Sequence, residues 1–223
     1  MTRRTMAIVS LLLVGLMSVA GFVVASALPE GAQLPIHWGL DGPDQFSDKW
    51  AALLLPPVIA GGVSLLLYFL PALEPRQDGL ARSQGLYFSS WAAALVIPVM
   101  IQLAEVSIAL HWGLPLYQLI VAGLGAAFVL MGNQLAKSRR MYMIGIRTPW
   151  TLASEEVWIR THRLGGKLMV AAGAVLILLS LARLPSGMFA TLTAVVLASA
   201  VGVPIVYSYL LWRQEGRSGP GIR

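Results

Sequence analysis

The residues from Thr5 to Pro29 read TMAIVSLLLVGLMSVAGFVVASALP, 25 positions without an Asp, Glu, Lys or Arg. A helix needs about 20 apolar residues to cross roughly 30 Å of hydrocarbon, so this segment is long enough to span a bilayer. A second uncharged stretch of 24 residues lies between Lys49 and Glu74. These two stretches predict membrane-spanning helices.

The same search for missing charges predicts four more spans. Between Arg82 and Lys137 a single acid, Glu105, interrupts the apolar run, and the turn-like residues 111–115 divide the run into two helices. Two further uncharged runs flank Arg183. The six predicted spans are residues 6–28, 51–73, 86–110, 114–135, 166–184 and 187–212. We therefore expect an all-α polytopic membrane protein, a single domain over residues 1–223 with an outer loop at 29–50 and a cytoplasmic loop at 136–165.

The composition agrees with this fold class. Hydrophobic residues make up 57% of the chain and charged residues only 12%, whereas soluble domains carry about a quarter charged residues. A chain this apolar cannot cover itself with polar surface, so the lipid bilayer is its expected surroundings. The chain has no cysteine, which excludes disulfides, thiolate metal sites and cysteine nucleophiles.

The distribution of positive charge predicts the orientation. If both ends lie in the cytoplasm, 14 of the 16 Lys and Arg residues are inside and only Lys49 and Arg183 are outside. The outer loop instead carries acids, namely Glu30, Asp41, Asp44 and Asp48. The net charge of +6 is therefore a topological signal, and we expect no direct contact with nucleic acid.

The N-terminus leaves one alternative open. Arg3 and Arg4, the apolar run and the small residues 25–27 together resemble a secretory signal peptide with its cleavage site. The apolar run is longer than the hydrophobic region of a usual signal peptide. We therefore favour an uncleaved first span.

The outer loop contains the sequence LPIHWGLDGPDQFSDK at residues 34–49. Gly and Pro between Asp41 and Asp44 are turn chemistry. Imidazole and carboxylates are metal ligands, so His37 with these two acids is one hypothesis. No second His or Glu completes a ligand set, and we favour an ordered turn without a metal.

The cytoplasmic loop has a more specific order than a charge signal requires. Ser154 followed by Glu155 and Glu156 is typical of a helix start, with a hydroxyl cap and acids at the positive end of the dipole. At helical spacing Trp158 and His162 share one face, together with Gly165, while the other face is basic. This pattern predicts a helix that lies at the lipid headgroups before it enters the membrane. The alternative is that the segment only sets orientation.

Glu105 is the one ionisable residue placed inside a predicted span. An acid in the membrane is a functional-site hypothesis, because exposing its charge to lipid is costly. Gln102 lies on the same helical face. We expect Glu105 to face a vestibule open to the outside, as a proton or cation site or as part of a pocket for a cationic peptide. The alternative is a protonated Glu105 that pairs with Gln118 and serves packing alone.

Both loops resemble those of the SdpI family of bacterial immunity proteins. The resemblance rests on LPIHW at 34–38 with GPD at 42–44 in a DUF1648-like outer loop, on GIRTPWTL at 145–152, and on SEEVW at 154–158 with THR at 161–163. It implies a multi-pass protein of the bacterial cytoplasmic membrane that protects the cell against a secreted pore-forming peptide toxin. It also implies two partners: the toxin at the outer face, and a transcriptional repressor held at the cytoplasmic face.

Two sets of site residues follow from this hypothesis. The outer-face residues expected to meet the ligand are His37, Trp38, Asp41, Asp44, Lys49, Gln102 and Glu105. The cytoplasmic motif expected to act as relay or docking surface comprises Asn133, Arg147, Thr148, Pro149, Trp150, Glu155, Glu156, Trp158, His162 and Arg163.

Two other function classes were weighed. A small transporter or channel coupled to protons or cations would use Glu105 and Gln102 within proline-broken helices. An enzyme is disfavoured, because the chain has no plausible nucleophile–base pair, no His-Glu metal helix and no phosphate loop. We therefore expect no catalytic residue and no cofactor.

Overall fold

A computed structural model describes residues 2–39 and 42–217 of the chain. Within these residues six helices are long and apolar enough to cross a membrane, which confirms the predicted all-α polytopic fold. These helices are α1 (Arg3–Ala27), α2 (Lys49–Leu73), α4 (Gln84–Ala109), α5 (Leu116–Leu135), α7 (Glu155–Leu181) and α8 (Ser186–Arg217).

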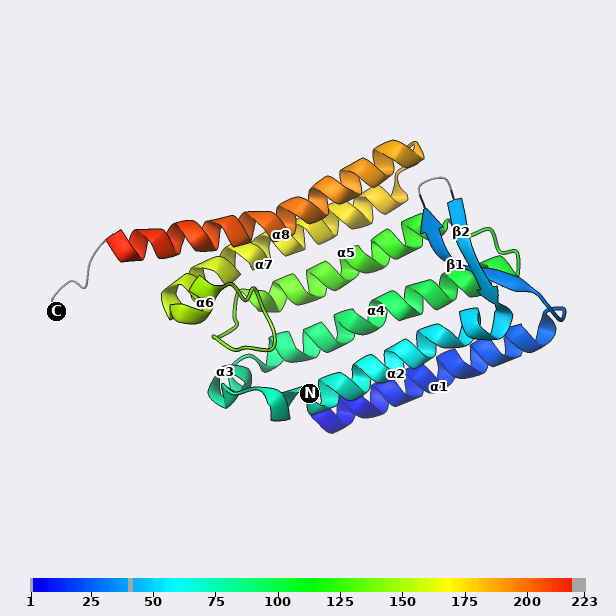
Figure 1. Cartoon of the computed structure of the whole chain (residues 1–223), viewed down its shortest axis with the longest axis horizontal. Helices are drawn as coiled ribbons and strands as arrows, with labels where there is room; N and C mark the ends of the chain where they lie inside the picture. Colours follow the sequence, from blue (N-terminus) through cyan, green and yellow to red (C-terminus); the bar gives the residue numbers. More distant parts are fainter. Residues whose placement is uncertain (1, 40–41, 218–223) are drawn as a thin grey trace.

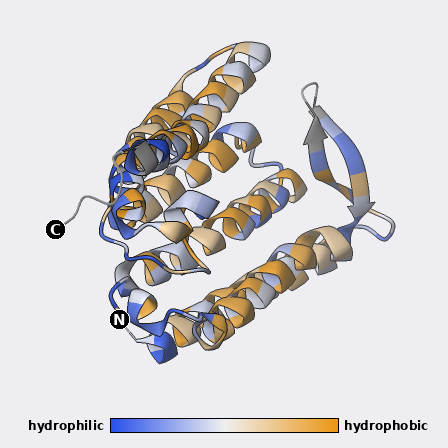
Figure 2. Cartoon of the chain, turned by 60° about the vertical axis from the view of Figure 1, so that its left-hand side comes forward, coloured by the Kyte–Doolittle hydropathy of each residue, from blue (hydrophilic) through white to orange (hydrophobic). Residues whose placement is uncertain are grey.

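The six long helices stand side by side in the order α1, α2, α4, α5, α7, α8, and each packs mainly against its neighbours in this row (Figure 1). Helix α1 begins and helix α8 ends on the same side of the bundle along the helix axes, as an even number of spans requires (Figure 1). The middle of the helices is apolar, with more hydrophilic residues toward the ends (Figure 2). Which end faces the cytoplasm stays a prediction from the charge distribution.

The outer loop folds into a small β-hairpin, the one departure from an all-α chain in the described residues. Strand β1 (Gln33–Gly39) pairs antiparallel with β2 (Gly42–Asp48), with Gln33 opposite Asp48 and register shifts around His37. The hairpin lies at the side of the bundle where α1 ends, opposite the side where α1 starts (Figure 1). Two short helices, α3 (Gln77–Ala81) and α6 (Pro149–Ala153), lie at the other end.

We expected a helix at the headgroups before the fifth span, but the structure has one continuous helix, α7, in this place. It runs without interruption from Glu155 to Leu181, so the predicted span at 166–184 is the second part of a longer helix. Its start is the predicted one: the Ser154 hydroxyl accepts a hydrogen bond from the backbone N–H of Val157 at 3.2 Å. Trp158 is fully buried inside the protein instead of lying among headgroups.

Glycines allow α5 and α7 to approach closely. A Cβ added at Gly125 would lie 2.7 Å from the carbonyl oxygen of Gly173, and one added at Gly132 would lie 2.8 Å from that of Gly166. Small residues bring membrane helices into backbone contact, where van der Waals packing is strongest. This contact fixes the start of α7, and with it the cytoplasmic motif, against the end of α5.

Candidate functional site

The hairpin presents an exposed pair of side chains. His37 Nδ1 and Asp44 Oδ1 lie 2.6 Å apart across the two strands. Trp38 lies in β1 opposite Pro43, and Asp41 is outside the described residues. A His–Asp pair on the outer hairpin can interact with a polar or cationic ligand.

Lys49 is buried at the start of α2. Its side chain is 6% exposed, and its ammonium group donates a hydrogen bond of 2.6 Å to the carbonyl oxygen of Leu28. Leu28 is the C-cap of α1, where carbonyl groups lack helical partners. Lys49 therefore ties the end of α1 to the start of α2 and holds the hairpin between them.

Gln102 joins three helices in the outer half of the bundle. It is 4% exposed, and its side-chain amide donates to the carbonyl oxygens of Met17 at 2.6 Å and Leu53 at 3.4 Å. The carbonyl of Leu53 lacks its usual helical partner because Pro57, four residues later, has no N–H. A freed carbonyl inside a membrane needs a donor from a neighbouring helix, and Gln102 is that donor.

Glu105 lies one turn after Gln102 and is 2% exposed. We expected Glu105 to face a vestibule open to the outside, but among residues 2–39 and 42–217 neighbouring helices enclose its side chain. In the described residues Glu105 Oε2 has no hydrogen-bond partner, and neither has Gln102 Oε1. Two buried acceptor oxygens on α4 thus lack partners in the described residues, and a proton or a donor from a ligand can satisfy them.

At the opposite end of the bundle, Glu74 holds the cytoplasmic loop. This carboxylate is 2% exposed and follows the last residue of α2. It accepts hydrogen bonds of 2.8–3.0 Å from the backbone N–H groups of Arg76, Tyr142 and Met143. Through these hydrogen bonds Glu74 joins the end of α2 to the loop after α5.

His162 holds the next part of the loop. Its Nε2 accepts a hydrogen bond of 2.9 Å from the backbone N–H of Ile146, while Nδ1 lies 2.8 Å from the carbonyl oxygen of Trp158. Gly145 has a φ of 122°, and a Cβ there would lie 2.6 Å from His162 Nε2. Only glycine fits this backbone conformation and this close approach.

The TPW sequence docks the loop onto α8. Thr148 and Thr151 form a reciprocal capping box at the start of α6. The hydroxyl of Thr148 lies 3.3 Å from that of Ser208, and the indole N–H of Trp150 donates to the same Ser208 hydroxyl. Trp150 also packs edge-on against Tyr209, with ring centroids 5.3 Å apart. Thr148 and Trp150 therefore connect α6 to α8.

The predicted cytoplasmic motif thus divides into two groups. Thr148, Trp150, Trp158 and His162 are partly or fully buried and hold the loop together. The exposed members, which remain free to face a partner, are Asn133, Arg147, Pro149, Glu155, Glu156 and Arg163. Arg163 lies on an exposed face of α7, as the predicted basic face of this helix requires.

Three residues that hold this end together were not predicted from the sequence: Glu74, Gly145 and Ser208. In the sequence, Glu74 marks only the end of an uncharged stretch. Its place directly before Pro75, in a loop that is otherwise basic, is the feature that sets this acid apart. Ser208 lies in an apolar run with nothing to distinguish it from other small residues. Its role depends on Trp150, 58 positions earlier.

Two protein-family models match the parts of the chain that contain the two loops. Residues 137–208 match the model of the SdpI/YfhL protein family. This part of the chain is similar to SdpI/YfhL proteins. That segment includes the loop held by His162 as well as α7 and most of α8, and it confirms the resemblance seen in the sequence. Residues 12–61, which include the hairpin, match a domain of unknown function, DUF1648.

A curated relative extends the similarity beyond the SdpI/YfhL segment. The chain is 27% identical over 173 residues to the immunity protein SdpI of Bacillus subtilis (strain 168). The aligned region covers 78% of this chain and 80% of that protein. No solved structure matches. The similarity supports a membrane immunity function for the chain.

Proposed function

We propose that this protein protects a bacterium against a secreted pore-forming peptide toxin from within the cytoplasmic membrane. The observation that carries the proposal is the similarity to an immunity protein over 78% of the chain. The match of residues 137–208 to the SdpI/YfhL family supports it. The protein acts by binding, and no step of the proposal requires catalysis.

The toxin meets the outer end of the bundle. The hairpin presents the exposed His37 and Asp44, and Gln102 and Glu105 lie below it with unpaired oxygens. An acidic outer loop attracts a cationic peptide before it inserts. The exposed basic residues of the cytoplasmic motif then serve as the docking surface for a cytoplasmic partner, such as a transcriptional repressor.

The experiment is expression of the chain in a bacterium that is sensitive to such peptides. Cells are challenged with a panel of secreted pore-forming peptides, and the inhibitory concentration of each is measured. We expect the chain to raise this concentration for at least one peptide. A matched variant with residues 33–48 replaced by a Gly/Ser linker should lose the protection while still reaching the membrane. Unchanged sensitivity to every peptide contradicts the proposal.

A second candidate, a small transporter or channel coupled to protons or cations, is favoured by one specific observation. Glu105 Oε2 is buried without a partner within a membrane-spanning helix, and such acids mark ion pathways. Reconstituted protein in liposomes should then show a proton or cation flux that Glu105→Gln abolishes. Equal flux in empty and protein-containing liposomes excludes this function.

A further inference from the structure

A cavity of about 310 Å³ lies between the cytoplasmic loop and helices α7 and α8. Its apolar lining includes Ile146 from the loop, Met169 from α7, and Val201 and Ile205 from α8. Arg147 also lines the cavity, together with Gly145, Thr148 and Ala200. The cavity is therefore a mostly apolar space, and Arg147 is the one Lys or Arg among its lining residues.

The cavity lies just below the level of the headgroups. Ile205 precedes Trp212 on α8 by two helical turns, about 10 Å at 1.5 Å per residue. Trp212 packs with Trp150 and Tyr209 in an aromatic cluster at the end of the span, and such clusters mark the membrane–water interface. The cavity thus opens at the depth where lipid acyl chains begin.

Arg147 lacks an acidic partner at this boundary. Its guanidinium donates one hydrogen bond, of 2.8 Å, to the carbonyl oxygen of Tyr142. Across residues 2–39 and 42–217 no carboxylate lies within ion-pair distance of it. A guanidinium has five N–H donors in a planar fork that matches a phosphate, so donors remain for an anion outside the protein.

We propose that this cavity holds one acyl chain of an anionic phospholipid whose phosphate pairs with Arg147. The apolar wall contacts the acyl chain. At the headgroup level the guanidinium of Arg147 donates hydrogen bonds to the phosphate, whose negative charge balances that of the guanidinium. A net negative headgroup is preferred over a zwitterionic one, because a choline group brings a second cation to Arg147. The site does not depend on the proposed toxin-binding function.

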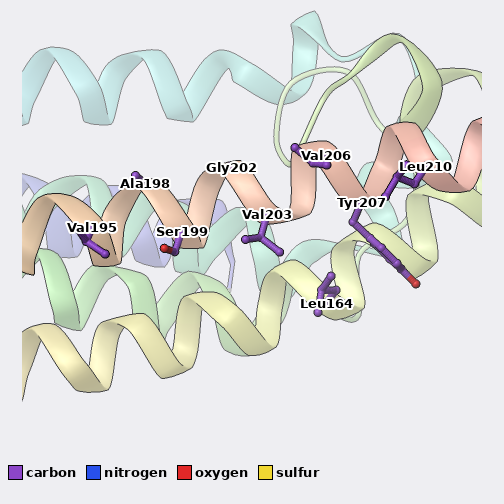
Figure 3. Close-up of a pocket in the computed structure, with 9 residues that line it drawn as sticks. All are labelled: Leu164, Val195, Ala198, Ser199, Gly202, Val203, Val206, Tyr207 and Leu210. Carbon is purple, nitrogen blue, oxygen red and sulfur yellow. The ribbon is translucent and has the colours of Figure 1, made fainter.

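A second groove on α8 serves as an internal control. This cavity of about 610 Å³ is lined by α8 residues that include Ala198, Val203 and Tyr207, and by Leu164 from α7 (Figure 3). No Lys or Arg lines it. Because no cation here can pair with a phosphate, we expect this groove to retain no phospholipid on release from detergent, so a bulky residue here should not change the binding of an anionic phospholipid.

The test is native mass spectrometry of the full chain released from detergent micelles with added dioleoylphosphatidylglycerol or dioleoylphosphatidylcholine. We expect one phosphatidylglycerol to remain bound to the parent, and Arg147→Gln to weaken its binding about tenfold, as for loss of a charge-assisted hydrogen bond. Val201→Phe should also weaken binding, because it fills the cavity. Val201 is 54% exposed, so the larger side chain is accommodated without disturbing the core.

Two matched variants should bind the lipid like the parent. Val203→Phe places the same bulk in the second groove, and Arg160→Gln removes an exposed cation from α7. Gel filtration verifies that each variant is folded. The proposal is overturned if the parent retains no phosphatidylglycerol, if phosphatidylcholine binds equally well, or if Arg147→Gln binds like the parent. Displacement of the lipid by millimolar inorganic phosphate also overturns it, since the site then recognises the anion alone.

Discussion

The imidazole of His162 stacks on the indole of Trp158, with ring centroids 3.8 Å apart and planes inclined by 16°. The Nδ1–H of His162 donates to the carbonyl oxygen of Trp158, and its Nε2 accepts from the N–H of Ile146. This pattern requires the neutral imidazole with its proton on Nδ1. The stacking within one turn of α7 orients the imidazole, and the hydrogen bond that it accepts from Ile146 holds the loop.

Removing the acceptor while keeping the ring should destabilise the protein. His162→Phe preserves the stacking on Trp158 but leaves the partly buried N–H of Ile146 without a partner. An unsatisfied buried donor costs about 1–3 kcal/mol, so we expect a lower melting temperature of the purified protein in detergent. A melting temperature equal to that of the parent means that the hydrogen bond contributes nothing.

Gly145→Ala should be more damaging than His162→Phe. The added Cβ meets His162 Nε2 at 2.6 Å, and the residue keeps a φ of 122° that L side chains rarely adopt. The matched control is Gly202→Ala on α8, where no atom lies within 4 Å of the new Cβ. Melting curves of both variants measure the effect. A smaller loss for Gly145→Ala than for His162→Phe contradicts the proposed close approach.

Glu74→Gln should loosen the join between α2 and the loop. Its amide replaces one acceptor oxygen with a donor that faces backbone N–H groups. We expect a loss of about 1–3 kcal/mol, seen as faster amide hydrogen exchange of the loop at Tyr142 and Met143. Asp78→Asn, an exposed acid on the neighbouring α3, is the control and should leave the exchange unchanged. Equal exchange in both variants refutes the role of Glu74.

The sequence predicted the features that depend on local chemistry and missed those that depend on contacts between distant segments. The spans follow from absent charges because hydrocarbon excludes charge, and the start of α7 follows from the hydroxyl of Ser154. Glu74 was missed because its partners are backbone N–H groups 68 and 69 positions away. The basic face of this helix, together with Trp158 on another face, suggested a helix at the headgroups, whereas Trp158 is fully buried in the protein interior and stacks on His162.

Gln102 and Pro57 should be energetically coupled. The side-chain amide of Gln102 pairs with the carbonyl of Leu53 that the missing N–H of Pro57 leaves free. Pro57→Ala supplies that N–H, so Gln102→Leu should destabilise this background less than the parent, with a coupling of about 1 kcal/mol. The four melting temperatures of a double-mutant cycle measure it. Strict additivity of the two substitutions disproves the link.

The exposed pair of His37 and Asp44 should matter for protection and not for stability. His37 and Asp44 are exposed, and an exposed ion pair contributes about 0–1 kcal/mol. We therefore expect His37→Ala and Asp44→Ala to melt like the parent, and to lower the toxin concentration that cells survive, because the ligand loses a contact at the outer face. Lys49→Met, in contrast, should lower the melting temperature. It removes the donor that pairs with the partly buried carbonyl of Leu28. If His37→Ala and Asp44→Ala protect cells as well as the parent does, the ligand binds elsewhere on the outer face.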